Sequence, residues 1–386
     1  MPSSFESGKT LLQCVRIRSS FTIARDALLT GDCMRATVFF ADSMGLRTPP
    51  VQVSNSLGDS STSARQVDFE NQLKGSRAGV FNPKVLVIGH RGCGKNNATS
   101  SQGEAVATRR PSIRENTIAS FNEAARNGVD FVEFDVQVTK DGHPIIFHDT
   151  HIIVEDMVPR KIGDITLQEF LGMGPQKGFD KAERSLYRKA RDGTVSQWTA
   201  TTEDPLCTLE EAFKCVDPSV GFNIEVKFDY IEETSDLELQ RVIHCTMEIV
   251  RQHSNGRKIY LSSFHPDAVH LLGSMQSTYP VFFLTLGGLY KFNDERRNSI
   301  QAAITVCQQS QLQGIVTEVN AVLHEPSLIS LVKEAHLWLF TFGELNNVEE
   351  AVHKQKDAGV DGVIADHVME IAKAVRQLEL HPMSSS

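Results

Sequence analysis

The chain of 386 residues and 42.8 kDa has room for two or three domains of about 150 residues, or for one barrel of roughly 250 residues with additions. Its 40% hydrophobic and 23% charged residues exclude a wholly disordered chain, and no apolar run approaches the ~18 residues that span a bilayer. The net charge of −9 argues against nucleic acid as the main partner, because a phosphate backbone calls for a basic surface.

Residues 1–80 differ in composition from the rest of the chain. They are rich in Ser and Arg, which is typical of a disordered extension or of a transit peptide, although Glu6 and Asp26 are unusual in the latter. No apolar signal-peptide core follows a basic start, so we do not expect secretion. The seven cysteines are irregularly spaced, which argues against a disulfide framework. We expect a protein of the plastid or cytoplasm.

From about residue 81, short β-branched and aromatic runs alternate with amphipathic stretches. This alternation predicts a parallel sheet with helical crossovers, and we expect a TIM-type (β/α)8 barrel over 81–378, followed by a disordered tail at 379–386. The strand candidates are 85–90, 130–138, 144–148, 221–227, 258–264, 280–285, 314–318, 337–342 and 362–366. Helix candidates include 117–127, 209–216, 236–253, 266–274, 325–335 and 348–358. Nine strands are one more than the barrel needs, so one pair must be a hairpin.

That hairpin is expected at the second and third strand candidates, because Asp141-Gly142 between two alternating runs is a strong turn signal. A two-residue turn would place Asp135 opposite His148. Since side chains alternate with period two, Glu133, Asp135 and His148 would then share one face. A three-residue turn would shift the register by one and separate them.

Residues 150–205 are the least regular part of the second half of the chain, and we interpret them as a small insertion over the barrel mouth. The basic run within it is interpreted as a solvated helix face rather than a substrate-binding group. This run consists of Lys181, Arg184, Arg188, Lys189 and Arg191.

Polar clusters follow several of the apolar runs. In a barrel, polar residues at the carboxyl ends of the strands line the active mouth. The clusters are His90-Arg91-Gly92, Glu115-Asn116-Thr117, Glu133-x-Asp135, His148-Asp149 and Glu225-x-Lys227.

The residue types in these clusters suit phosphodiester hydrolysis. Three carboxylates, Glu133, Asp135 and Glu225, suit a divalent metal such as Mg²⁺ or Ca²⁺. Two histidines suit proton transfer near neutral pH. Arg91 and Lys227 supply positive charge for phosphoryl oxygens.

Each cluster also has a structural interpretation. Glu133 and Asp135 could pair with Arg126 or Lys140, and Glu225 could pair with Lys227. Glu115-Asn116-Thr117 could be only a helix start, because Asn and Thr are good N-caps. The functional interpretation depends on all the clusters meeting at one end of the barrel.

The ordered motifs resemble those of the glycerophosphodiester phosphodiesterase family and are similar to its soluble plant members. The resemblance covers about residues 84–375. Its motifs are G-H-R-G (89–92), E-N-T-I-A-S-F (115–121), G-V-D-F-V-E-F-D-V-Q-V-T-K-D-G (128–142), P-I-I-F-H-D (144–149), T-L-E-E-A (208–212), N-I-E-V-K (223–227), S-S-F-H-P (262–266), L-F-T-F-G-E-L-N-N (339–347) and G-V-D-G-V-I-A-D (359–366).

This resemblance implies hydrolysis of glycerophosphodiesters, such as glycerophosphocholine, to sn-glycerol 3-phosphate and an alcohol, with a role in recycling lipid phosphate. It implies an acid–base pair of His90 and His148 and phosphate binding by Arg91 and Lys227. It implies metal ligation by Glu133, Asp135 and Glu225. Glu115 would support the site near the metal or through a bond to His90 or Arg91, and Asn116 and Trp338 would also have supporting roles.

Two features depart from the family pattern. The link from Cys93 to Arg114 is long, and Phe340-Thr341-Phe342-Gly343, with Trp338 ahead of it, stands where many members have Trp-Thr-x-Asn. The second departure changes the expected aromatic wall of the site, so the preference for the alcohol or for glycerol does not follow from the resemblance. An alternative keeps the barrel but takes lysophospholipids or phosphoinositides as substrate, and a second alternative is a non-catalytic binding barrel. No stable membrane insertion is expected.

Overall fold

The computed structural model describes residues 85–96, 112–176, 184–190, 193–229 and 233–380. The predicted extension at 1–80, most of the 93–114 link and residues 381–386 of the predicted tail lie outside these ranges. The last helix, α11 (Val368–Leu380), ends two residues beyond the predicted end of the barrel at 378.

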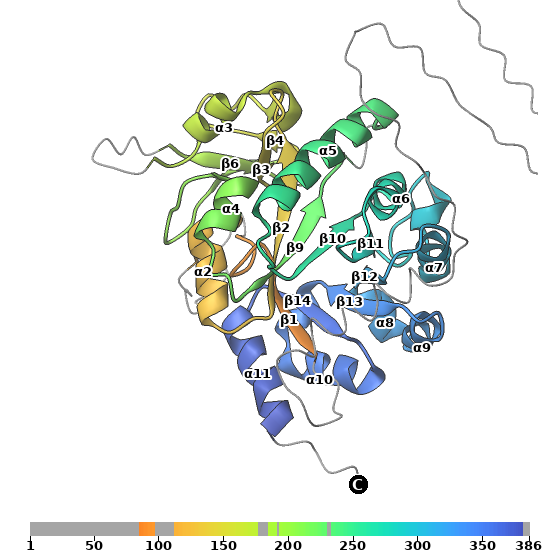
Figure 1. The fold of residues 1–386 in the computed structure, drawn as a ribbon. Coiled ribbons are helices and arrows are strands. Elements are labelled where there is room, and N and C mark those ends of the chain that lie inside the picture. Colours follow the sequence, from red (N-terminus) through yellow and green to blue (C-terminus); the bar gives the residue numbers. More distant parts are fainter. Residues whose placement is uncertain (1–84, 97–111, 177–183, 191–192, 230–232, 381–386) are drawn as a thin grey trace, which may run out of the picture. The chain divides into compact units, whose positions relative to one another are not determined.

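Eight parallel strands close into a barrel, with helices between and around them (Figure 1). The order around the barrel is β1, β2 and then β9 to β14, and β1 pairs with both β2 and β14. The strands are β1 (Leu86–Gly89), β2 (Phe131–Val138), β9 (Gly221–Val226), β10 (Ile259–Ser263), β11 (Val281–Thr285), β12 (Gly314–Glu318), β13 (Trp338–Phe342) and β14 (Gly362–Ala365). The predicted (β/α)8 barrel is therefore confirmed.

Helices accompany the barrel, and several of them begin at short polar side chains that satisfy free backbone N–H groups. Thr117 caps α2, Ser235 caps α5, and Thr208 forms a capping box with Glu211 at α4. Together with α11 these helices are α2 (Ile118–Arg126), α4 (Leu209–Cys215), α5 (Asp236–His253), α6 (Pro266–Met275), α7 (Ile300–Gln309), α8 (Val319–His324), α9 (Ser327–Glu334) and α10 (Glu349–Ala358), with 3₁₀ turns η2 (Glu295–Arg297) and η3 (Glu344–Asn347). Within the described ranges, no helix has both the length and the apolar character needed to cross a membrane.

The base of the barrel is filled by aromatic rings that pack against glycines on neighbouring strands. Phe131 lies beside Gly221, and a Cβ on that glycine would lie 2.3 Å from the ring. Phe282 and Gly314 form a second such pair, and Phe340 faces Gly362. Because these rings close the lower lumen, the polar side chains of the same strands occupy its carboxyl end.

The predicted hairpin exists, but its predicted register is wrong. β3 (Pro144–Ile146) pairs antiparallel with β2, and Gln137, rather than Val138, lies opposite Ile145. The backbone of Thr139 bonds to His143 across a three-residue loop, in which Gly142 has φ +85°. The left-handed glycine accommodates one residue more than the tight turn that Asp-Gly favours. β3 is thus the one strand candidate of the nine that the barrel does not need, and it lies outside the circle of eight parallel strands.

An insertion follows β3 and returns to the barrel at β8 (Cys207–Thr208), which pairs with β3. Its own core contains Phe147, Phe170, Leu186 and Trp198, all buried. The insertion consists of β4 (His151–Ile152), β5 (Arg160–Lys161), η1 (Ile162–Asp164), α3 (Leu167–Met173), β6 (Leu186–Lys189) and β7 (Val195–Trp198). It interrupts the crossover from β2 to β9, so it begins beside the two strands that carry the carboxylates (Figure 1).

Candidate active site

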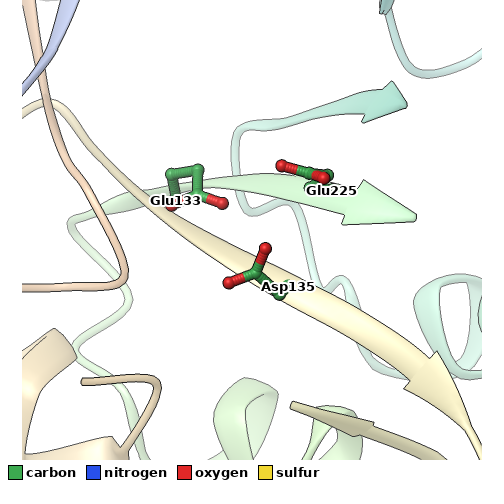
Figure 2. A group of neighbouring side chains, drawn as sticks. All are labelled: Glu133, Asp135 and Glu225. Atoms are coloured by element: carbon green, nitrogen blue, oxygen red, sulfur yellow. The ribbon is translucent and has the colours of Figure 1, made fainter. Parts of the chain in front are cut away.

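Three buried carboxylates meet at the carboxyl end of the barrel. Glu133 and Asp135 lie two residues apart on β2, and Glu225 is the register partner of Asp135 on β9. One oxygen atom of each lies within 4.8 Å of the others, and Figure 2 shows the side chains turned toward one another. The period of two along a strand puts both β2 carboxylates in the lumen, while Val132, between two of the lumen residues, joins the outer core.

Two cations lie against these carboxylates. The Nζ of Lys227 is 3.1 Å from Asp135 Oδ1 and 3.1 Å from Glu225 Oε1, so the expected alternative pairing with Glu225 is present, but it is shared with Asp135. The Nε of Arg91 lies 3.5 Å from Asp135 Oδ2. The surface pairing proposed for Glu133 and Asp135 does not form with Arg126, which pairs with Glu123 instead.

The electrostatics of the cluster fit a divalent cation. Burial, followed by the charge of Asp135, raises the pKa of Glu133 to about 8. Burial also opposes the charge on Asp135, but Lys227, His148 and Arg91 outweigh it and hold the pKa of that carboxyl well below its usual range. Burial also raises the pKa of Glu225, although the charge of Lys227 opposes this shift. Three carboxylates thus face two cations, and the protein alone does not stabilise all three as anions. A hard cation coordinated by oxygen atoms would supply the missing charge.

Arg91 occupies a strained turn directly after β1. Its φ is +49°, in the left-handed region that non-glycine residues rarely adopt, and its backbone N–H donates to Glu133 Oε2 at 2.8 Å. Gly92 follows with φ +90°, and a Cβ there would lie 2.4 Å from the hydroxyl oxygen of Ser120. A cost of about 1–3 kcal/mol for such a backbone is typical of functional turns, and here it aims both the N–H and the guanidinium of Arg91 at the carboxylates.

Glu115 is fully buried and accepts a hydrogen bond from Arg91 Nη1 at 2.7 Å. From the sequence, Glu115 is expected to lie near the metal or to bond to His90 or Arg91, and the bond to Arg91 is the one present. Burial opposes ionisation of Glu115, but the charges of Arg91 and Arg188 outweigh it and lower its pKa to about 2. Glu115 therefore holds Arg91 as an ionised partner.

Asn116 also has a left-handed backbone, with φ +58°, and its Nδ2 donates to Asp135 Oδ2 at 2.8 Å. The helix cap at this point is Thr117, so Asn116 is available to orient a carboxylate. Its own N–H donates to the carbonyl of Arg91 at 3.0 Å, which ties the two strained residues together.

His90 has a carboxylate partner that the sequence interpretation missed. Its Nδ1 lies 2.7 Å from Oδ1 of Asp366, which follows the last barrel strand. Asp366 is oriented by Asn347, whose side chain accepts from its backbone N–H and donates to its Oδ2. Burial lowers the pKa of His90, but the charge and hydrogen bond of Asp366 outweigh it, and the net shift is upward. The position of Asp366 after a strand was the available signal.

His148 has a matching partner, because its Nδ1 lies 2.6 Å from Asp149 Oδ1. Burial, together with the charges of Arg91 and Lys227, lowers the pKa of His148 to about 4. His148 is thus near the site although the register argument that placed it there was wrong. Strand β3 ends at Ile146, and one further backbone bond joins the N–H of Phe147 to the carbonyl of Asp135, so alternation no longer dictates where the side chain of His148 points.

Arg188 corrects the interpretation of the basic run. It lies on strand β6, not on a helix, and its side chain is only 14% exposed. It donates to Glu115 and to Asp149, and so joins the residues around Arg91 to those around His148. Lys181 and Arg191 lie outside the described residues.

The structure does not bring Trp338 to the site. It is the first residue of β13, at the amino end of the strand, and packs on Phe340 in the base of the barrel. The aromatic pair at the carboxyl end is Phe264 and Phe342, with ring centroids 5.8 Å apart. Counting along the strand direction from Phe340 would have indicated this, since the mouth lies at the carboxyl end.

A cavity of about 450 Å³ lies beside the cluster. It shares Lys227 with the site and is bounded by Gln137 of β2, Thr150 of the insertion and the residues that precede α5. The carboxylate cluster is not part of its lining. The cavity therefore offers space next to the charged centre rather than over it.

Comparisons with known proteins identify the family of the chain. The Glycerophosphoryl diester phosphodiesterase family matches residues 90–370. The chain is 46% identical over 301 residues to the chloroplastic glycerophosphodiester phosphodiesterase GDPD1 of Arabidopsis thaliana, covering 77% of this chain and 82% of the relative. It is 28% identical to the human glycerophosphocholine phosphodiesterase GPCPD1, over 78% of this chain and 47% of that protein.

Two solved structures share the fold. An Oleispira antarctica phosphodiesterase in complex with the product sn-glycerol-3-phosphate has a TM-score of 0.52 at 20% identity, covering 76% of this chain and 97% of that one. A glycerophosphodiester phosphodiesterase from Parabacteroides distasonis has a TM-score of 0.54 at 16% identity, covering 77% and 99%. Because the family match spans more than half of the chain, and the plant relatives match over most of their length, the chain belongs to the glycerophosphoryl diester phosphodiesterase family and is an enzyme of that class.

Proposed function

We propose that the enzyme hydrolyses glycerophosphodiesters such as glycerophosphocholine to sn-glycerol 3-phosphate and an alcohol, with a divalent cation and two histidines. The observation that carries the proposal is the meeting, at one end of the barrel, of the carboxylate cluster with two histidines that each have a carboxylate on Nδ1. The product named for the Oleispira antarctica structure and the substrate in the human relative's name support the same chemistry.

Glu133, Asp135 and Glu225 would hold the cation, and Mg²⁺ or Ca²⁺ suits three carboxylate ligands. Such a cation would stabilise negative charge on a phosphoryl oxygen. Arg91 and Lys227 would donate to the other phosphoryl oxygens, where charge increases in the transition state. Glu115 keeps the guanidinium of Arg91 in place for that contact.

The two imidazoles divide the proton transfers. The low pKa of His148 keeps it neutral at pH 7, so its Nε2 can accept a proton from the attacking water. The raised pKa of His90 favours the protonated ring, which can give a proton to the departing alkoxide. The water oxygen forms a bond to phosphorus, and the bond from phosphorus to the alcohol oxygen breaks. His148 takes a proton from the water, and His90 gives a proton to the departing alkoxide.

A second candidate substrate is a lysophospholipid. The loop after β11, at the mouth, exposes 51% of Leu289 and 60% of Tyr290, next to Lys291. Exposed apolar and aromatic side chains beside a cation are typical of contact with a lipid surface. The first assay therefore includes lysophosphatidylcholine vesicles beside glycerophosphocholine.

The test is release of glycerol 3-phosphate from glycerophosphocholine by the full chain with EDTA, Mg²⁺ or Ca²⁺. We expect release only with a cation, none from Glu133→Ala, and kcat lowered about 10²–10⁴-fold by His90→Ala or His148→Ala. Glu350→Ala, at an exposed Glu on α10, is the matched control and should retain activity. Equal release with EDTA, or near-normal turnover by a histidine variant, would contradict the mechanism. Choline release from the vesicles alone would move the proposal to lysophospholipids.

We place this reaction in the plastid or the cytoplasm. The name of the Arabidopsis relative includes "chloroplastic", and the composition of residues 1–80 includes the Arg and Ser of a transit peptide together with acidic residues. Import of the full chain into isolated plastids would favour the first compartment, and exclusion would favour the second.

A further inference from the structure

We propose that Arg188, which the insertion contributes, is a positioning residue for hydrolysis. It orients both His148 and Arg91 through the carboxylates that bind them. The inference deepens the proposed function, because it rests on the roles given there to these two residues. It assigns the insertion a part in the reaction.

Arg188 uses all three guanidinium nitrogens within the site. Its Nε donates to Asp149 Oδ2 at 2.8 Å, and its Nη2 donates to Glu115 Oε1 at 2.8 Å. Its Nη1 donates to the carbonyl of Asn96 at 3.1 Å. Lysine has no planar fork and could not make these three contacts in fixed directions.

The plane of this guanidinium is fixed by Trp198. The carbon centre of Arg188 lies 3.8 Å from the centroid of the indole ring, and Trp198 is buried. The indole N–H donates to Asn96 Oδ1 at 3.3 Å. β6 and β7 are paired with Leu186 opposite Trp198, so one small sheet of the insertion presents both side chains. The group is built before substrate binds and needs no contact with substrate.

Arg188 reaches each of the two groups through a single carboxylate that binds both partners. Asp149 gives Oδ2 to Arg188 and Oδ1 to Nδ1 of His148, at 2.6 Å. Glu115 Oε1 accepts from both Arg188 and Arg91 Nη1. Arg188 therefore fixes the tautomer of the imidazole through one carboxylate and the direction of the phosphate-binding guanidinium through the other.

The charges around His148 give the proposal a measurable sign. Arg91 and Lys227 disfavour its protonation, while Asp135, Asp149 and Glu115 favour it. Arg188 partly neutralises Asp149 and Glu115. Loss of Arg188 should therefore raise the pKa of His148, whereas loss of the Asp149 charge should lower it. The two changes move the acid limb of kcat/KM in opposite directions.

The experiment compares Arg188→Gln, Arg188→Lys, Asp149→Asn and the double variant Arg188→Gln/Asp149→Asn in the full chain. Glycerophosphocholine is the substrate, with a saturating concentration of Mg²⁺ or Ca²⁺. The range runs from pH 3 to 9, so that it includes the acid limb set by His148, whose pKa is about 4. The matched control is Arg160→Gln, because Arg160 belongs to the same insertion and its guanidinium bonds to Asp156 and the carbonyl of Val158 rather than to Asp149 or Glu115. The folded fraction of each variant is measured by thermal unfolding, and kcat is expressed per folded enzyme.

We expect Arg188→Gln to lower kcat about 10–100-fold, with KM changed by less than about 3-fold and the acid limb shifted to higher pH. Arg188→Lys should give a smaller loss, because its ammonium keeps the charge but cannot hold both carboxylates. Asp149→Asn should lower kcat with the limb shifted to lower pH, and the double variant should lose less than the product of the single losses. Arg160→Gln should match the wild type.

Wild-type kcat and an unshifted pH profile in Arg188→Gln would overturn the inference. A loss explained entirely by the unfolded fraction would also overturn it, since that describes a structural role. If Arg188→Gln does not fold, the same criteria apply to Arg188→Lys. Failure of the proposed function looks different, because the wild-type enzyme itself would then release no glycerol 3-phosphate, or His148→Ala would be fully active.

Discussion

At the scale of single residues, the site depends on opposite environments for similar groups. His90 and His148 both have a carboxylate on Nδ1, yet the pKa of His90 is raised and that of His148 is lowered to about 4. Arg91 disfavours protonation of both rings, but His148 also lies in the field of Lys227, whereas the charge and hydrogen bond of Asp366 outweigh burial at His90. A pair of titratable groups pushed apart in this way is suited to giving and taking a proton at one pH.

Glu133 allows a prediction on stability and pH. Its pKa is raised from 4.5 to about 8, so its contribution to folding is fully present below pH 4.5 and is lost as pH rises toward 8. In EDTA, the Tm of the wild type should fall relative to that of Glu133→Gln between about pH 4.5 and 8. Mg²⁺ or Ca²⁺ should raise the wild-type Tm at pH 8 and leave that of Glu133→Gln nearly unchanged.

Differential scanning calorimetry at several pH values measures both effects. The exposed Glu350→Gln serves as control, because its removal should leave the pH dependence of the wild type in place. If the Tm of the wild type and that of Glu133→Gln change in parallel with pH, Glu133 is not the carboxylate whose raised pKa causes the pH dependence.

At the scale of elements, the insertion is held to the barrel by its own core. Ile145 of β3 and Phe147 pack with Phe170 of α3 and with Trp198, and Phe170 is fully buried. Since the same insertion carries Arg188, its packing should matter for turnover as well as for stability.

Phe170→Ala should therefore lower the free energy of unfolding by about 3–5 kcal/mol, because it removes a buried ring and leaves a cavity. Urea unfolding measures the change, and kcat of the folded enzyme should fall with it. Leu237→Ala, at a side chain that is 78% exposed, should change either quantity little. A loss of less than about 1 kcal/mol for Phe170→Ala would mean that the insertion does not depend on this core.

At the scale of the whole barrel, the two ends have different tasks. Phe131, Phe282 and Phe340 fill the base, where glycines on neighbouring strands leave room for their rings. The carboxylates occupy the other end, with Phe264 and Phe342 near the mouth. This division is the usual one for parallel barrels, in which chemistry lies beyond the carboxyl ends of the strands.

Two aromatic substitutions on one strand test this division. Trp338→Phe, at the base, should leave kcat and KM for glycerophosphocholine within about 3-fold of the wild type, since it keeps an aromatic ring in a packing position. Phe342→Ala, at the mouth, should raise KM more than it lowers kcat, because it removes a contact wall and no reacting group. Steady-state kinetics of both variants measure these effects. A large effect of Trp338→Phe with little effect of Phe342→Ala would contradict an active mouth at the carboxyl end of the strands.

The sequence determined the elements because their causes are local. Alternating and amphipathic runs fixed the strands and helices, and the barrel followed, since parallel strands with helical crossovers have few ways to bury both faces. Period two along β2 put Glu133 and Asp135 on one side, and polar residues after each strand indicated the mouth. The ligand set, the histidines and both cations were named on these grounds.

Tertiary structure decided what depends on approach between distant segments. The hairpin register turned on one left-handed Gly142, which the Asp-Gly signal could not specify. Asp366 reaches His90 from the other end of the chain, and Arg188 reaches Glu115 from an insertion whose pattern is weak. Trp338, by contrast, was open to sequence reasoning, because it is the first residue of its strand and the mouth lies at the carboxyl end. Local patterns set which elements form, whereas hydrogen bonds and burial between distant residues set which charges meet.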